Sequence, residues 1–139
     1  MSDSVREALR QLAGATDLQS SQASYHRMLN AIGHDHSGTL YRSALPAVDD
    51  LLAISCTGEA WSSDAALDVL IEVTTSFELE LEVARDHEDV RRFKQSLLAA
   101  VATRRDEIAQ LAASAPHRRT RERAAELDEA LSNDDSPKP

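Results

Sequence analysis

Hydrophobic positions recur at helical spacing along most of the chain. Such spacing places apolar residues on one face of an α-helix, which can then pack against a neighbouring helix. Within residues 21–32, for example, the apolar stripe consists of Tyr25, Met28, Leu29 and Ile32. The pattern predicts about five to six helices, over residues 3–13, 21–32, 39–54, 62–77, 87–114 and 118–131.

Glycine, proline and serine residues mark the ends of these predicted helices. Gly14 and Gly33 are expected to stop the first two helices, Gly33 in the left-handed conformation. Pro46 lies inside the third apolar pattern, so we expect either a kink or a later start of that helix. Ser62 or Ser63 is expected to cap the fourth helix.

Two segments do not follow the helical pattern. The stretch "FELELEV", residues 77–83, alternates apolar and acidic positions as a half-buried strand does. A lone strand has no partner, so we prefer a helix end or an extended loop. Residues 133–139 are expected to be a disordered tail. The predicted architecture is all-α, with antiparallel helical hairpins stacked as a short α-α solenoid over residues 1–115 and a separate C-terminal helix over residues 116–132.

The composition narrows the class of protein. The chain has 139 residues, a length that suits one compact domain. Its single cysteine, Cys56, excludes an intrachain disulfide and a metal site built from several thiolates. The first residues lack the basic and apolar regions of a signal peptide, and no apolar stretch is long enough to cross a bilayer. We therefore expect a cytoplasmic protein without a membrane partner.

Charge is distributed unevenly along the chain, whose net charge is −9. Residues 1–90 hold 16 acidic and 5 basic residues, whereas residues 91–123 hold 3 acidic and 9 basic ones. An acidic body repels nucleic acids and attracts basic partners. The exception is the basic cluster of Arg118, Arg119, Arg121 and Arg123, which has no interleaved aromatic residues. We expect this cluster to pair with acidic regions of the same chain, or to form an oligomer contact, rather than to bind nucleic acid.

The segment "GHDHSGTLYRSALPA", residues 33–47, runs from the end of the second predicted helix into the third. It resembles an element of small bacterial HEAT-like helical repeat proteins that reads "GNQHSGTLYPAAVPA". The matching residues are Gly33, His36, Ser37, Gly38, Thr39, Leu40, Tyr41, Pro46 and Ala47. The chain departs from the element at His34, Asp35 and Arg42, which replace Asn, Gln and Pro. The resemblance covers about residues 24–82.

What the resemblance implies is a HEAT-like α-α solenoid that binds other proteins. Many small proteins of this kind sit in bacterial toxin loci, where their proposed role is immunity to a partner toxin. The element is specific for the fold and carries no particular activity.

The same segment raises the alternative of a metal site. His34 and His36 lie two residues apart, and His26 lies one helix earlier. Zinc needs three or four converging ligands, so a metal-dependent enzyme at these three histidines is one hypothesis. We favour a structural turn, in which His36 or Ser37 hydrogen-bonds exposed helix ends. No metal or other cofactor is therefore expected.

Acidic residues form the most informative predicted surface. Asp64, Asp68 and Glu72 fall at i, i+4 and i+8 on one helix face, which brings like charges together. Such charge runs are usually solvated faces, but they can also dock a basic protein. Trp61, in the loop before this helix, either covers the core or anchors an interface. The expected partner-binding residues are Asp49, Asp50, Trp61, Asp64, Asp68, Glu72, Glu78, Glu80 and Glu82.

No catalytic constellation stands out. Cys56 and the serines lack the flanking sequence of a hydrolase, and no pair of carboxylates is singled out as general acid and base. The expected function is a non-enzymatic protein-binding module, namely an immunity protein whose acidic face occludes the active site of a basic toxin domain. The alternative is a structural adaptor or self-associating regulatory domain, and the sequence leaves the oligomeric state open.

Overall fold

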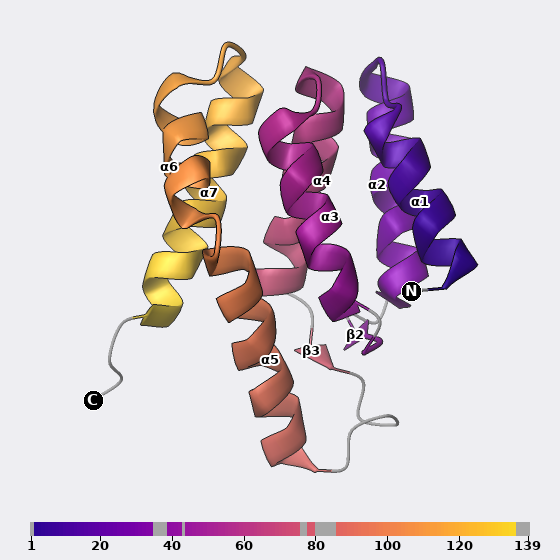
Figure 1. Cartoon of the computed structure of the whole chain (residues 1–139), viewed down its shortest axis with the longest axis vertical. Helices are drawn as coiled ribbons and strands as arrows, with labels where there is room; N and C mark the ends of the chain where they lie inside the picture. The colour runs from indigo at the N-terminus through magenta and orange to yellow at the C-terminus, as the bar shows by residue number, and fades with distance from the viewer. Residues whose placement is uncertain (1, 35–38, 43, 76–77, 80–85, 136–139) are drawn as a thin grey trace.

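The computed structural model describes residues 2–34, 39–42, 44–75, 78–79 and 86–135, and these residues form the predicted all-α fold (Figure 1). Three two-residue strands, β1 (Gly33–His34), β2 (Thr39–Leu40) and β3 (Glu78–Leu79), lie between helices. The helices of the described part are α1 (Asp3–Ala13), α2 (Leu18–Ile32), α3 (Ala44–Thr57), α4 (Ala60–Thr75), α5 (His87–Ala102), α6 (Arg105–Ser114) and α7 (Arg118–Asp135).

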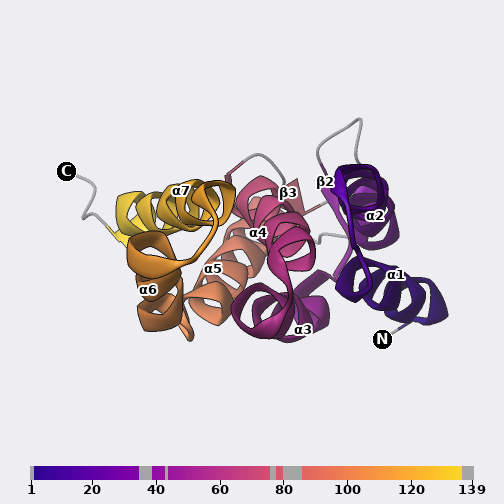
Figure 2. The same ribbon diagram turned by 90° about the horizontal axis from the view of Figure 1, so that it is seen from above.

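Three helical hairpins stack side by side, as predicted for a short α-α solenoid. The hairpins are α1 with α2, α3 with α4, and α6 with α7. Seen from above, they form two layers, with α2, α4 and α7 in one layer and α1, α3 and α6 in the other (Figure 2). The helix α5 connects the second hairpin to the third and extends beyond the end of the stack (Figure 1).

A continuous apolar core runs through the stack. Eleven of the sixteen residues of α4 are buried, because this helix contacts α2, α3 and α7. The helix α7 contributes Ala124, Leu127 and Leu131, which are 0%, 0% and 3% exposed. The C-terminal helix, predicted to need a surface on which to dock, therefore finds one against α4 and α6.

Local sequence explains where several helices begin. The side chains of Ser2 and Asp86 accept hydrogen bonds from the backbone of the first turns of α1 and α5. At α2, Asp17 and Ser20 form a reciprocal capping box. This box starts α2 at Leu18, earlier than the apolar stripe indicated, whereas α1 has the predicted bounds.

The connection between α2 and α3 differs from the prediction. Gly33 ends α2 but is extended, with φ −178° and ψ −156°, so the predicted left-handed conformation is wrong. It begins β1, which pairs antiparallel with β2. The helix α3 then begins at Ala44 rather than at residue 39. Pro46 lies in its first turn, where the missing backbone N–H has no intrahelical partner to lose, so of the two alternatives the later start is confirmed.

The start of α4 also differs from the prediction. This helix begins at Ala60, so Trp61 lies in its first turn rather than in a loop, and Ser62 and Ser63 are not caps. Both serines are buried, and their hydroxyls donate to the carbonyl oxygens of Ala13 (2.9 Å) and Ser55 (2.6 Å). They therefore satisfy carbonyl groups near the ends of α1 and α3, where intrahelical partners run out.

Two further predictions are corrected. The helix predicted over residues 87–114 is divided at Thr103 and Arg104 into α5 and α6, so the described residues form seven helices rather than five to six. In the segment 77–83, Glu78 and Leu79 do find a strand partner, because β3 pairs in parallel with β2. The remaining residues of that segment lie outside the described residues. At the C-terminus, α7 continues to Asp135, into the segment expected to be a disordered tail.

Candidate functional site

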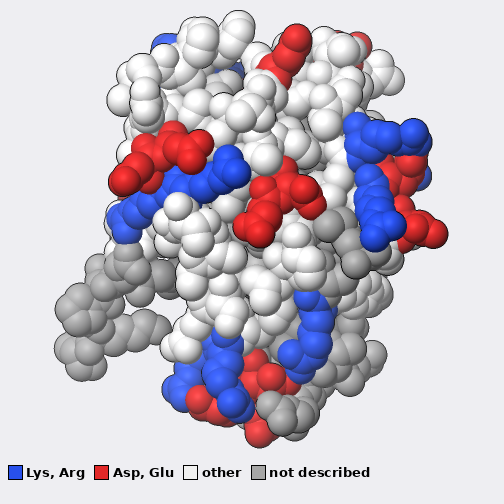
Figure 3. All heavy atoms as spheres, in the orientation of Figure 1, with Lys and Arg blue, Asp and Glu red and all other residues white. Residues whose placement is uncertain are grey.

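The outer surface of α3 carries acidic side chains that the rest of the stack does not neutralise. Asp49 and Asp50 are exposed on α3, and neither forms an ion pair with any residue in the described part of the chain. The helices α3 and α4 contain no Lys or Arg. Figure 3 shows acidic side chains gathered over the centre of this face. This pair is therefore free to interact with another molecule.

Acidic residues on the neighbouring helices are instead paired locally. Glu7 on α1 pairs with Arg10, and Glu88 on α5 pairs with Arg91. Arg104, at the start of α6, lies 3.8 Å from Glu107. In Figure 3 the acidic groups at the left, right and lower edges of the face accordingly lie beside basic ones. Such exposed pairs contribute little to stability, but they reduce the local net charge.

Asp64 is buried beneath α7, which corrects its predicted place on an exposed acidic face. The residue is 3% exposed, and its Oδ1 accepts a hydrogen bond of 2.6 Å from the hydroxyl of Thr120. The Nε of Arg119 lies 3.8 Å from its Oδ2. A hydrogen-bond donor and a cation on α7 therefore take the place that a solvent shell or a partner would occupy.

Asp68 is covered in the same way, one turn further along α4. The Nε of Arg123 donates to its Oδ1 at 2.7 Å. Burial raises the pKa of Asp68 above its ordinary value, and the nearby charge of Arg123 opposes this effect without cancelling it. The expectation that the arginine cluster pairs with acidic regions of the same chain is confirmed for Arg119 and Arg123.

Trp61 lies at the edge of the same helix pair. Its ring is half-buried in the first turn of α4, and the guanidinium carbon of Arg119 lies 5.6 Å from the ring centroid. That geometry is a cation–π contact within the molecule. Of the remaining predicted residues, Glu72 is half-buried on α4, the backbone of Glu78 lies in β3, and Glu80 and Glu82 lie outside the described residues.

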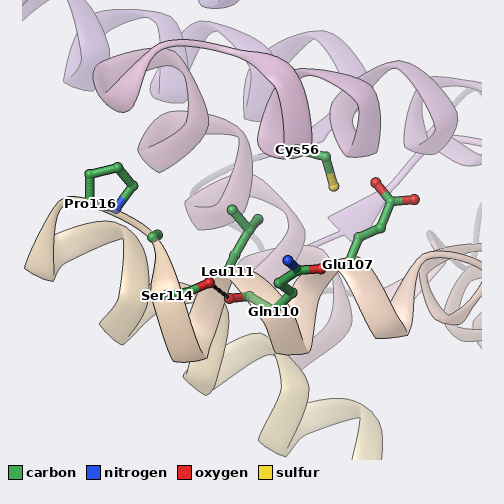
Figure 4. A pocket seen from close by; sticks show the side chains of 7 residues that line it. Cys56, Glu107, Gln110, Leu111, Ser114 and Pro116 are labelled. Atoms are coloured by element: carbon green, nitrogen blue, oxygen red, sulfur yellow. Dashed lines mark hydrogen bonds between the residues drawn. The ribbon is translucent and has the colours of Figure 1, made fainter.

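A pocket of about 350 Å³ lies between the end of α3 and the helix α6. Figure 4 shows Cys56 of α3 facing Glu107 of α6, with Gln110 and Ser114 further along that helix. Burial raises the pKa of the Cys56 thiol, and a hydrogen bond with Glu107 raises it further. A catalytic cysteine needs a lowered pKa, so this environment disfavours a nucleophilic role.

The histidines do not gather into a metal centre in the described part of the chain. No group of three or more His, Cys, Asp or Glu side chains there has the arrangement of a metal site. His26 is exposed on α2, with its ring 4.9 Å from that of Tyr25 at an interplanar angle of 66°. His36 lies outside the described residues, as does Ser37, so their predicted hydrogen bonds to helix ends stay a prediction.

Thr120 is the residue that sequence reasoning missed. It stands four residues before Ala124, which places it on the stripe that continues to Leu127 and Leu131. A polar residue in a buried stripe needs a hydrogen-bond partner, and here the partner is Asp64. The stripe itself could have shown that this hydroxyl faces inward.

Comparison of the chain with models of protein families, with curated proteins and with solved structures found no match. Among the helices that the structure describes, none combines the length and the apolar character needed to cross a membrane.

Proposed function

We propose that this chain is a non-enzymatic protein-binding module whose α3 surface docks a positively charged protein. The observation that carries the proposal is the pair Asp49 and Asp50, exposed on a helix without basic residues and unpaired within the described part of the chain. Complementary charge accelerates the encounter of two proteins and suppresses wrong partners. A rigid stack of helical hairpins presents such a surface without the cost of ordering it.

The docking surface in this proposal is smaller than the predicted set of acidic residues. Asp64 and Asp68 are engaged by α7, and Trp61 contacts Arg119, so these three residues support the fold. Among the predicted residues whose side chains are exposed in the described part of the chain, Asp49 and Asp50 remain, and they form the centre of the proposed surface. The raised pKa of the Cys56 thiol disfavours a nucleophilic role for that one residue.

The proposed partner is a basic bacterial toxin domain, which the protein would neutralise by covering its active site. This part of the proposal rests on the resemblance of residues 33–47 to an element of small HEAT-like proteins. Immunity of this kind needs no chemistry from the inhibitor, only a bound surface that excludes the toxin's substrate.

A growth assay in a bacterial host tests this function. The product of the reading frame adjacent to this gene is expressed alone and together with the full-length protein. Poisoning by the neighbour alone, followed by rescue on co-expression, is the expected result. Absence of poisoning, or poisoning without rescue, would overturn the immunity proposal, and the adaptor alternative would then be tested by measuring the mass of the assembled protein in solution.

A further inference from the structure

A polar groove lies on the opposite layer of the molecule, between α2, α4 and α7. Its volume is about 370 Å³. Gln22, Tyr25 and His26 of α2 line one side, and Arg119 and Arg123 of α7 line the other. The groove is distinct from the α3 surface, because α2, α4 and α7 form the layer that faces away from α3 (Figure 2).

The two arginines of the groove are engaged to different degrees. Arg123 donates its Nε to Asp68, which also lines the groove, at 2.7 Å. Arg119 makes no hydrogen bond to any described residue, and its Nε is buried without an acceptor. Its nearest counter-charge, Oδ2 of Asp64, lies 3.8 Å from that nitrogen. The buried Nε is out of reach of solvent, so the donors of this partly exposed side chain that are open to an acceptor from outside the chain are the two terminal Nη groups.

Arg119 is also held in position. Its guanidinium lies 5.6 Å from the centroid of the Trp61 ring, and Asp64 attracts it from below. Asp64 is itself fixed by the hydroxyl of Thr120 at 2.6 Å. A fixed guanidinium loses little conformational entropy when it binds a ligand, and its planar fork matches the two oxygens of a carboxylate or phosphate.

The charge of the groove favours an anion. Two arginines and one aspartate line it, whereas Asp64, the counter-charge of Arg119, does not line it and is only 3% exposed, so the positive charge of the two guanidiniums borders the groove. We propose that this groove binds the oxyanion of a small ligand, a phosphate or carboxylate group, with Arg119 as the principal donor. Arg123 contributes positive charge while it remains bonded to Asp68.

Nuclear magnetic resonance of the full-length protein tests this site through the Nε–H signals of its arginines. Inorganic phosphate and acetate are titrated separately at constant ionic strength, with chloride as the reference salt. A saturable shift of the Arg119 signal with either anion supports the site, and the responding anion identifies the ligand class. No saturable shift with either anion overturns the proposal.

Substitutions on α7 show whether the response belongs to the groove. Arg119→Gln removes the Arg119 signal, so binding to this variant is followed through the Nε–H signal of Arg123, which also lines the groove. Binding is expected to weaken about tenfold or more, because a charge-assisted hydrogen bond is lost. Arg118→Gln is the matched control, since Arg118 is exposed and bonded to Glu122 at 2.8 Å, and it should bind as the wild type does. Equal weakening by both substitutions would overturn the assignment to Arg119. If Arg119→Gln fails to fold, Arg119→Lys takes its place, because it keeps the charge but loses the planar fork.

Discussion

Thr120 and Asp64 join α7 to α4 through one buried hydrogen bond of 2.6 Å. Both residues are almost fully buried, at 4% and 3% exposure. Arg119 adds a cation at 3.8 Å from the same carboxylate. Removing either partner of a buried polar pair costs more than the pair contributes, because the remaining group is then left unsatisfied.

Replacing Asp64 by alanine is therefore expected to lower the free energy of unfolding by about 1–3 kcal/mol, because the Thr120 hydroxyl loses its acceptor. Asp64→Asn keeps an acceptor oxygen and should cost less. Asp50→Ala is the control, and because Asp50 is exposed its effect should stay within about 0.5 kcal/mol. Urea unfolding measures the free energy of unfolding of all three variants. Equal values for Asp64→Ala and Asp50→Ala would show that the buried contact does not contribute to stability.

Asp68 predicts a dependence of stability on pH. Burial raises its pKa in the folded protein above the value of about 3.9 for an unfolded chain, although Arg123 opposes the rise. Between the two pKa values the folded state binds more protons, so the contribution of Asp68 to stability falls as pH rises through that window.

The measurement compares the wild type with Asp68→Asn from about pH 3.5 to pH 5.5, below the range in which histidines titrate. Other carboxylates titrate in both proteins, so the difference between them isolates Asp68. The wild type should lose stability relative to the variant as pH rises. A difference that moves in the opposite direction would mean that Arg123 outweighs burial.

At the scale of the elements, the sequence pattern predicts a helix well where apolar spacing alone sets its bounds. The bounds of α1 follow from its apolar spacing, which Ser2 and Gly14 flank. The division between α5 and α6 could not be predicted in this way, because Val101 and Ile108 stay seven residues apart and so keep helical phase across the break. Strand β3 was missed because its partner β2 lies far away in sequence.

Gly58 makes the tight turn between α3 and α4 possible. Its N–H donates to the carbonyl of Ile54 at 2.8 Å, and a Cβ at this position would lie only 2.5 Å from that oxygen. Gly58→Ala should therefore destabilise the protein by about 1–3 kcal/mol, the usual cost of forced overpacking. Gly14→Ala is the matched control, since its Cβ would lie 3.6 Å from the nearest backbone atom. Thermal unfolding measures the stability of both variants, and an equal loss of stability in the two would contradict this explanation.

At the scale of the whole molecule, stacking decides which acidic residues remain available. The sequence showed that residues 1–90 are acidic and that arginines follow residue 117, and it indicated pairing between the two. Periodicity alone could not show that α7 lies beside α4 rather than beside α3. That arrangement neutralises Asp64 and Asp68 and leaves Asp49 and Asp50 on the opposite layer. Of the predicted docking residues, Asp64 and Asp68 thereby form a structural group, and Asp49 and Asp50 form an exposed group.

Charge reversal tests whether the exposed group is the docking surface. Asp49→Lys with Asp50→Lys is compared with Glu126→Lys and Glu129→Lys, which make the same change of charge at exposed positions on α7. Both pairs alter the net charge equally, so a difference between them reports on location. Neither pair changes a buried contact, and both variants are expected to fold.

The deciding measurement is the rate at which each variant associates with the toxin that growth rescue identifies. Stopped-flow fluorescence measures this rate at several salt concentrations. At low salt, the α3 variant (Asp49→Lys with Asp50→Lys) is predicted to associate at least roughly ten times more slowly than the α7 variant (Glu126→Lys with Glu129→Lys). The association rate of the α3 variant should also depend less on salt concentration. Equal rates and equal salt dependence for the two variants would contradict the proposal that Asp49 and Asp50 dock the partner.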